Sequence, residues 1–284
     1  MSEPAVRRIG FAYNPTAEAA LELRERAAGW CAVRGIAHWA TTAEDLEGLL
    51  RELPGTDALV VLGGDGTFLR GARAVVETGT PILGVNVGKV GFLSKVETEG
   101  LDRVLGQLLD GRFRIEERMA LEGRIRRAGR SDPDERHVAL NDIVVARGSL
   151  ARVCRLEVSI DESHLATFVA DGLVVASPTG STGYSFSAGG PIVAPESRNL
   201  IVTPIAGYLS AIRSIVVEPT RVVRCHVQGA HEALVSVDGR EDVPIAVGDV
   251  VEVLAMDAPV RFVEPDGALP FWDLVRRKVE LLPS

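Results

Sequence analysis

The sequence predicts an α/β + all-β fold, with an N-terminal open parallel α/β sheet followed by a C-terminal β-sandwich. Over residues 8–110, short apolar runs alternate with helix-like stretches, which is the pattern of a parallel sheet. From about Phe113 to Phe262 the chain breaks into short β-rich runs separated by Gly, Asp, Pro and Ser, which is typical of packed antiparallel sheets. A length of 284 residues allows two such domains, each with its own core.

The N-terminal elements are expected in a Rossmann-like order. Asp57–Leu62 is the strongest strand, because its continuous apolar character suits a sheet covered on both faces. The predicted elements are strand Arg8–Tyr13, helix Thr16–Arg34, strand Ala37–Ala40, helix Ala43–Glu52, strand Asp57–Leu62, helix Thr67–Glu77, strand Pro81–Asn86 and helix Glu97–Asp110.

The C-terminal part is expected to form a β-rich domain over residues 113–263, after an α/β domain over 1–112. Its clearest strands are Arg155–Ile160, Leu173–Ala176, Ile215–Val217 and Leu234–Val237. Phe271–Leu282 has helical apolar spacing, so residues 264–284 are expected to pack back on the first domain. The charged segment 123–137 is interpreted as a solvated hairpin loop in preference to a basic binding patch.

Charge and cysteine content exclude several classes of protein. The 31 basic against 39 acidic side chains give a net charge of −8, which argues against a nucleic-acid binder or an acidic-membrane binder. The three cysteines are far apart and are expected to be reduced and buried. The N-terminus has no apolar signal segment and no run approaches the roughly 20 apolar residues of a membrane span, so a cytoplasmic protein is expected.

A glycine-rich loop, Gly63-Gly64-Asp65-Gly66-Thr67, follows the strongest strand and opens a helix. Ligands bind at this carboxyl edge of open parallel sheets. Consecutive glycines and a helix N-terminus favour phosphate, whereas Asp65 would repel it unless it holds a metal or accepts a hydroxyl proton. The alternative is an ordinary turn in which Asp65 only caps the helix. Neither the dinucleotide fingerprint nor the P-loop motif is present.

A second informative run extends from Asp171 to Val193 and is rich in glycine and hydroxyl side chains. Tyr184 adds a stacking face with a polar tip, so the run suits sugar hydroxyls and a flat ring. A Ser/Thr/Gly-rich loop without chemistry is an equally good interpretation of this composition. A serine hydrolase is disfavoured, because no Gly-x-Ser-x-Gly elbow surrounds Ser181.

These segments resemble the NAD kinase family. Residues 63–70 resemble its signature, although diacylglycerol and sphingosine kinases share the first five positions and phosphofructokinases a close variant. Residues 171–193, 84–93 and 139–142 resemble three further family segments, in family order and over most of the chain. A lipid kinase and a non-catalytic nucleotide-binding regulator are the rival hypotheses. Residues 171–193 argue against the first rival, and the intact Asp65 argues against the second.

The resemblance implies an NAD kinase that takes NAD and ATP as substrates and Mg²⁺ as a nucleotide-borne ion, with no dedicated metal site in the protein. It also implies a homodimer or homotetramer with neither nucleic-acid nor membrane partners. Asp65 would be catalytic, orienting the ribose 2′-hydroxyl and accepting its proton late, since a carboxylate is a far weaker base than an alkoxide. The implied NAD-binding residues are Gly66, Phe92, Asn141, Asp142, Asp171, Thr182, Tyr184, Ser187 and Ala206, and the implied phosphate-binding residues are Gly63, Gly64, Gly66, Thr67 and Arg70.

Several positions depart from the family pattern. Lys89 stands where His or Arg is frequent, and Asp142 replaces Glu, which puts the strength of the ribose contact in question. The segment 203–214 keeps only its opening residues and Arg213. Residues 237–240 resemble the family's Asp-Gly-Gln turn with Arg240 in place of glutamine, and a plain β-turn is an equally good interpretation.

Overall fold

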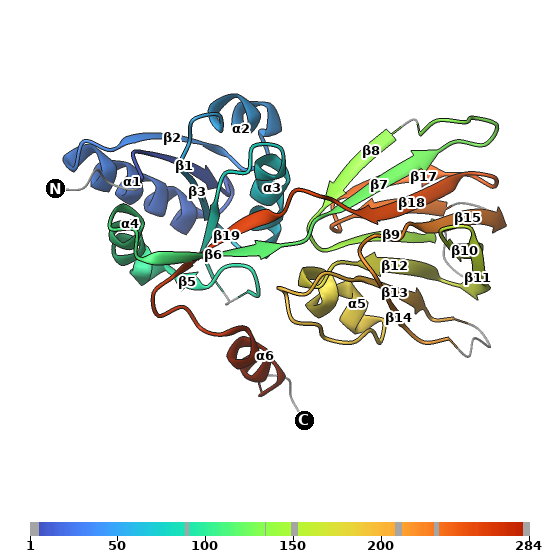
Figure 1. Cartoon of the computed structure of the whole chain (residues 1–284). Helices are drawn as coiled ribbons and strands as arrows, with labels where there is room; N and C mark the ends of the chain where they lie inside the picture. Colours follow the sequence, from blue (N-terminus) through green and yellow to red (C-terminus); the bar gives the residue numbers. More distant parts are fainter. Residues whose placement is uncertain are drawn as a thin grey trace. The chain divides into compact units, whose positions relative to one another are not determined.

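The structure is a computed structural model, and it describes residues 6–88, 91–133, 135–148, 153–207, 212–229 and 233–280. The chain divides into two compact units (Figure 1). The first contains the chain up to Glu117 and again from Pro259, and the second contains Arg118–Ala258. The division falls beyond residue 112 and before residue 263, because strands β6 (Phe113–Arg118) and β19 (Val260–Pro265) both join the sheet of the first unit.

The first unit is built on one sheet with the strand order β2-β1-β3-β4-β19-β6, and β5 lies beside β4. The pairs β1/β2, β1/β3, β3/β4, β4/β5 and β4/β19 are all parallel. The predicted open parallel sheet is therefore confirmed. Its remaining strands are β1 (Arg8–Tyr13), β2 (Ala37–Thr42), β3 (Ala58–Leu62), β4 (Ile82–Asn86) and β5 (Val96–Glu97).

Helices cover both faces of this sheet. On one face, α1 (Glu18–Val33) and α4 (Leu101–Leu109) share a core with the β3 side chains Val60 and Leu62. On the other face, α3 (Asp65–Val76) approaches β3 so closely that a Cβ on Gly71 would lie 2.9 Å from Val61 Cγ2. The helix α2 (Leu46–Glu52) packs beside α3. Burial on both faces explains why β3 is apolar without alternation.

The C-terminal helix α6 (Phe271–Glu280) belongs to the first unit, as predicted. Its first residue places an aromatic ring 6.5 Å, centroid to centroid, from the ring of Phe92, within the range of aromatic pairing. None of the described helices is long and apolar enough to cross a membrane.

The second unit consists of two six-stranded sheets, ordered β11-β10-β15-β18-β7-β8 and β14-β13-β12-β9-β16-β17. Side chains from both sheets, such as Leu156 and Val253 from one and Val145 and Leu173 from the other, form one core, which confirms the predicted sandwich. The strands are β7 (Leu121–Arg126), β8 (Glu135–Ala139), β9 (Asp142–Arg147), β10 (Cys154–Ile160), β11 (Ser163–Ala170), β12 (Gly172–Ala176), β13 (Leu200–Ile205), β14 (Ile215–Val217), β15 (Val223–Gly229), β16 (Ala233–Val237), β17 (Glu241–Ile245) and β18 (Val250–Ala255).

Strand β12 is buried on both faces, unlike the alternating β16. Its inner side chains join the core of the sandwich, while Val174 and Ala176 on its outer face contact Ala188 and Val193. These two contacts belong to the glycine-rich run, which forms a 3₁₀ turn (Thr179–Thr182) and the short helix α5 (Tyr184–Ser187) beside β12 (Figure 1). Covering an apolar sheet face is thus one physical role of this run.

All three cysteines are free and buried, as predicted. Burial raises the pKa of the Cys31 thiol to about 11 and that of Cys225 to about 12. A thiol with such a pKa carries almost no thiolate at neutral pH, so neither side chain is a nucleophile.

Candidate active site

Asp65 lies in the first turn of α3, directly after β3 and the two glycines. The N-cap position is occupied by Gly64, so Asp65 does not cap its own helix. Its carboxylate instead accepts hydrogen bonds from the backbone N–H groups of Phe92 (2.9 Å) and Leu93 (3.2 Å), in the loop that follows β4. The interpretation of Asp65 as a helix cap is therefore wrong, because its oxygens connect two loops at the carboxyl edge of the sheet.

The approach of the 91–93 loop to Asp65 requires a glycine. A Cβ on Gly91 would lie 1.9 Å from Asp65 Oδ1, far inside any van der Waals contact. Gly91 belongs to the Gly-Phe-Leu segment that the sequence singled out, but no role was assigned to it. Its absent side chain is what allows the two neighbouring N–H groups to reach the carboxylate.

The other residues predicted to bind phosphate differ in their accessibility. Gly66 is exposed in the first turn of α3, where backbone N–H groups have no acceptor within the helix. Thr67 is 4% exposed, and a Cβ on Gly63 would lie only 2.5 Å from its hydroxyl. The Thr67 side chain is therefore buried against the backbone of the glycine-rich loop. Arg70 extends toward Glu44, with 3.8 Å between guanidinium nitrogen and carboxylate oxygen.

Phe92 is half-buried beside the C-terminal helix. Besides the pairing with Phe271, its ring lies 5.6 Å from the Lys278 ammonium group. Both neighbours come from α6, so this helix forms one side of the surroundings of Phe92. Lys89 lies outside the described residues.

In the second unit, Asn141 and Asp142 stand at the start of β9 and are held by Asp238, at the tip of the β16–β17 hairpin. One Asp238 oxygen accepts N–H bonds from Asn141 (2.7 Å) and Asp142 (3.2 Å), and the other accepts from Leu140 (3.0 Å). The Asp142 carbonyl in turn accepts the Asp238 N–H at 2.9 Å. The backbone of both predicted binding residues is thereby fixed from one side.

The glycine-rich run holds the same backbone from the other side. The Ser177 N–H donates to the Asn141 carbonyl at 2.8 Å, and the Ser177 hydroxyl donates to the Leu140 carbonyl at 2.5 Å. A Cβ on Gly180 would lie 2.0 Å from the Asn141 carbonyl oxygen. The hydroxyl of Ser181 is turned inward and exchanges hydrogen bonds with the backbone of Val193. Ser181 is therefore structural, which agrees with the rejection of a serine hydrolase.

A cavity of about 410 Å³ opens at these residues. It brings together three of the predicted NAD-binding residues, Asn141, Asp142 and Tyr184, and Tyr184 is 48% exposed. The remaining lining residues were not predicted, and they are Val144, Ala146, Leu234, Ser236, Asp238, Gly239 and Asp242. Its lining combines polar groups with apolar side chains, which is the mixed character of a nucleoside site.

The four other predicted NAD-binding residues of the second unit do not line this cavity. Asp171 forms an ion pair with Arg147, with 2.8 Å between carboxylate oxygen and guanidinium nitrogen. Thr182 donates its hydroxyl to the Thr179 carbonyl, and Ser187 is exposed at the end of α5. Ala206 is exposed with a φ of 47°, in the left-handed region that non-glycine residues seldom adopt. Residues 208–211 of the divergent segment lie outside the described residues.

The electrostatics of the cavity centre on two neighbouring carboxyl groups. Burial raises the pKa of Asp142 to about 7, and the adjacent Asp238 carboxyl contributes to the rise. Burial also raises the pKa of Asp238, and the N–H donors from residues 140–142 together with Arg240 offset part of that rise. Asp142 therefore exchanges a proton near neutral pH, which an exposed aspartate does not do.

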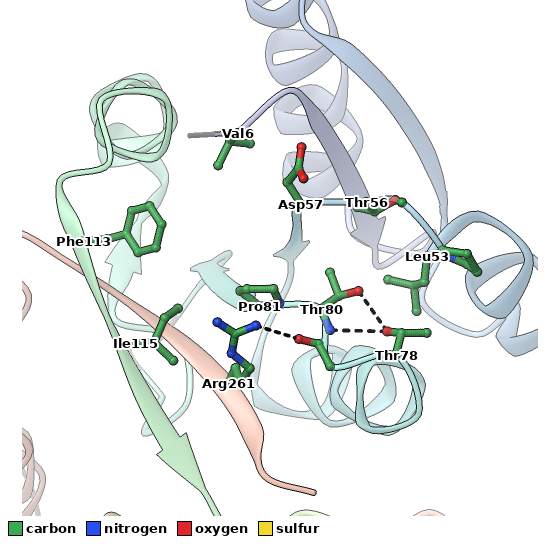
Figure 2. A pocket seen from close by; sticks show the side chains of 13 residues that line it. Val6, Leu53, Thr56, Asp57, Thr78, Thr80, Pro81, Phe113, Ile115 and Arg261 are labelled. Carbon is green, nitrogen blue, oxygen red and sulfur yellow. Dashed lines mark hydrogen bonds between the residues drawn. The ribbon is translucent and has the colours of Figure 1, made fainter. Parts of the chain in front are cut away.

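Another cavity, of about 420 Å³, lies at the opposite edge of the first sheet (Figure 2). Its lining residues Asp57 and Pro81 precede β3 and β4, whereas the Asp65 loop follows β3. Thr78 and Thr80 hydrogen-bond to each other beside it, and Arg261 donates to the Gly79 carbonyl at 3.3 Å. Because ligands of open parallel sheets bind at the carboxyl edge, this cavity is not the candidate active site.

Comparison with known proteins identifies both halves of the chain. The ATP-NAD kinase N-terminal domain matches residues 10–113, and the ATP-NAD kinase C-terminal domain matches residues 140–265. The chain is 40% identical to the NAD kinase of Moorella thermoacetica over 280 residues, covering 98% of this chain and 85% of that protein. It is 38% identical to the NAD kinase of Heliobacterium modesticaldum over 283 residues, covering 96% and 98%.

Solved structures with the same fold agree with these matches. Yeast NADH kinase complexed with NADH has a TM-score of 0.85 at 22% identity, covering 100% of this chain and 89% of that one. The NAD kinase from Archaeoglobus fulgidus in complex with ATP has a TM-score of 0.78 at 24% identity, covering 97% and 100%. The two domain matches and the identity to bacterial NAD kinases over nearly the full length show that this chain belongs to the NAD kinase family.

Proposed function

We propose that the protein transfers the γ-phosphoryl group of ATP to the 2′-hydroxyl of the adenosine ribose of NAD, giving NADP and ADP. The observation that carries this proposal is the placement of Asp65 at the carboxyl edge of the parallel sheet, with its carboxylate fixed by the N–H groups of Phe92 and Leu93. A carboxylate held in this way is already oriented before a substrate arrives.

Asp65 would act as the proton acceptor for the attacking hydroxyl. Its two backbone hydrogen bonds use only part of the acceptor capacity of a carboxylate, which leaves lone pairs for the 2′-hydroxyl. Phosphoryl transfer has a loose, charge-spread transition state, so orientation of the hydroxyl matters more than its early ionisation. The proton would therefore pass to Asp65 late, as the bond between ribose oxygen and phosphorus forms.

The triphosphate would lie against the glycine loop, with Gly63, Gly64, Gly66, Thr67 and Arg70 as its contacts. Free N–H groups in the first turn of α3 favour phosphate oxygens. The surface pair of Arg70 with Glu44 contributes little stability and can open for a phosphate. A Mg²⁺ ion carried by ATP would neutralise charge on the β- and γ-phosphates. Within the described residues, no group of three or more His, Cys, Asp and Glu side chains is arranged to hold a metal.

The second unit would hold NAD through the 410 Å³ cavity, with Asn141 and Asp142 on the adenosine end and Tyr184 stacked on a ring. On the family resemblance, Phe92 would pack on the adenine, and the rest of NAD would be lined by Asp171, Thr182, Ser187 and Ala206. The same resemblance implies a homodimer or homotetramer, and light scattering on the protein as it elutes from a size-exclusion column would measure the mass of the assembly.

The proposed reaction is tested by incubating the purified protein with NAD, ATP and Mg²⁺ and coupling any NADP to an NADP-specific dehydrogenase. We expect NADP to accumulate in proportion to enzyme and to require both substrates. Parallel reactions with NADH, and with polyphosphate in place of ATP, define the acceptor and the donor. Phosphorylation of diacylglycerol or sphingosine without any NADP would replace the proposal with a lipid kinase.

Replacing Gly91 by alanine should abolish most of the activity without removing any reacting group. The new Cβ would overlap Asp65 Oδ1, so the carboxylate has to leave the position set by its two N–H donors. We expect kcat to fall by at least about 10²-fold, the cost of a displaced catalytic group. Gly106→Ala is the control, because a Cβ at that position in α4 would have nothing within 4 Å apart from its chain neighbours and the backbone of its own helix. Normal kcat in Gly91→Ala would show that the position of Asp65 is not set by this loop.

A further inference from the structure

The tip of the β16–β17 hairpin contains a buried carboxylate, Asp238, that the turn itself does not require. Asp238 and Gly239 have φ angles of 50° and 65°, the left-handed pair typical of a type I′ hairpin turn. Asn-Gly is a strongly preferred dipeptide there, so the turn itself does not need a carboxylate. Yet the Asp238 side chain is only 1% exposed, and burying a carboxylate is costly unless hydrogen bonds compensate.

The compensation comes from three consecutive N–H groups. Leu140 donates to one oxygen of Asp238, while Asn141 and Asp142 donate to the other. Arg240 stands 3.4 Å from the same carboxylate. An asparagine at this position would offer a single oxygen and would turn its NH₂ group toward one of the three N–H donors. The three donors thus explain why this hairpin carries an aspartate.

The three N–H groups belong to residues that face the cavity. Asn141 and Asp142 both line it, and Asp238 with Gly239 forms part of the same wall. The side-chain oxygen of Asn141 is buried and has no hydrogen-bond partner among the described residues. A buried acceptor that is unsatisfied in the free protein is what a ligand donor would complete.

We propose that Asp238 is a positioning residue for the acceptor nucleotide, which fixes the side chains of Asn141 and Asp142 in the cavity by holding the backbone of residues 140–142. This role rests on the proposed function, in which Asn141 and Asp142 bind the adenosine end of NAD. Asp238 reaches the nucleotide only through them. A shift of this backbone moves both side chains together. Loss of the Asp238 carboxylate should therefore weaken NAD binding more than it slows phosphoryl transfer.

A matched control exists in the same unit. Asp249 is also a buried carboxylate in a turn between two strands, the one that joins β17 to β18, and it is 3% exposed. It accepts N–H bonds from Ala128 (2.8 Å) and Ala246 (3.0 Å) and a bond from Arg127 (3.0 Å). It is not among the residues that line the cavity. Asp238→Asn and Asp249→Asn therefore remove comparable hydrogen bonds, and only the first acts on Asn141 and Asp142.

The test compares steady-state kinetics of the two variants and the wild type, at a temperature where all three are folded. Asp238→Asn should raise KM for NAD about tenfold or more, as expected for losing a charge-assisted hydrogen bond, while KM for ATP and kcat at saturating NAD stay within about threefold. Asp249→Asn should leave KM for NAD unchanged. An equal rise in both variants, or no rise in Asp238→Asn, would overturn the positioning role. A wild-type protein that makes no NADP would instead overturn the proposed function.

Hydrogen exchange provides a measurement on the wild-type protein, independent of whether Asp238→Asn folds. If the contact of Asp238 with residues 140–142 is coupled to NAD binding, adding NAD without ATP should slow amide exchange in the peptide containing Leu140–Asp142 at least about threefold. The amides of Ala128 and Ala246, held by Asp249, should not respond. Binding of NAD, detected by calorimetry, without added protection at residues 140–142 would contradict the proposal.

Discussion

Asparagine at position 65 is expected to lower kcat by about 10²–10⁴-fold, the usual contribution of a positioned proton acceptor. The amide cannot take the proton from the 2′-hydroxyl. It also replaces one carboxylate oxygen with an NH₂ group, which then faces the N–H of either Phe92 or Leu93. We expect KM for NAD to change by less than about tenfold, because the proposed adenosine contacts lie on other residues. Initial rates of NADP formation at saturating substrates measure both effects.

The two consequences of Asp65→Asn can be separated by a stability measurement. A donor facing a donor costs about 1–3 kcal/mol of the free energy of unfolding, which urea titration would detect. Gly91→Ala gives the complementary case, since it keeps the carboxylate and displaces it. If Asp65→Asn were as active as the wild type, Asp65 would be a structural link between two loops, and the proton acceptor would have to be sought elsewhere.

Local sequence was enough to place the glycine-rich loop of Asp65 at the end of a strand of the parallel sheet. Strand β3 is apolar because it is buried on both faces, and a buried parallel strand that ends in glycines determines which edge of the sheet binds ligands. The two N–H donors that hold Asp65 could not be predicted in the same way, since they lie 27 and 28 residues further along the chain. The glycine of the 91–93 segment was visible in the sequence, but its purpose depends on that distant contact.

The second unit shows the same limit. The Val237–Arg240 turn was recognised, but the turn alone does not reveal where the Asp238 carboxylate points, and its partner Leu140 is 98 residues away. Strand β19 was expected within the β-rich domain because its composition resembles that of its neighbours. It pairs with β4 of the first sheet, and a choice between two sheets has no local signal. The sheet that a strand joins depends on partners that lie far away in the chain.

Asp142 should make the protein less stable as pH rises toward 7, and Asp142→Asn should remove that effect. With a folded-state pKa of about 7 and an unfolded value near 3.9, the native protein holds an extra proton between these pH values. The contribution of Asp142 to stability is therefore fully present below about pH 4 and is lost as pH rises through about 7. Above pH 7 the variant should be more stable by up to about 4 kcal/mol, measured by urea unfolding at several pH values.

Asp249→Asn provides a control whose effect on stability should have the opposite sign. Burial alone would raise the pKa of the Asp249 carboxyl. The N–H donors of Ala246 and Ala128 and the Arg127 guanidinium outweigh burial, so the pKa of Asp249 is lowered and Asp249→Asn should destabilise the protein above about pH 4.

Asp142→Asn should weaken function while it increases stability. In the wild type, KM for NAD should rise as pH falls below 7, because a protonated Asp142 accepts ribose hydroxyls less well than the carboxylate does. Asp142→Asn should bind NAD weakly without this dependence on pH. If its difference in stability from the wild type were the same at pH 5 and pH 8, Asp142 would titrate like an exposed carboxyl. The shorter acidic side chain would then give this enzyme no response to pH in the neutral range.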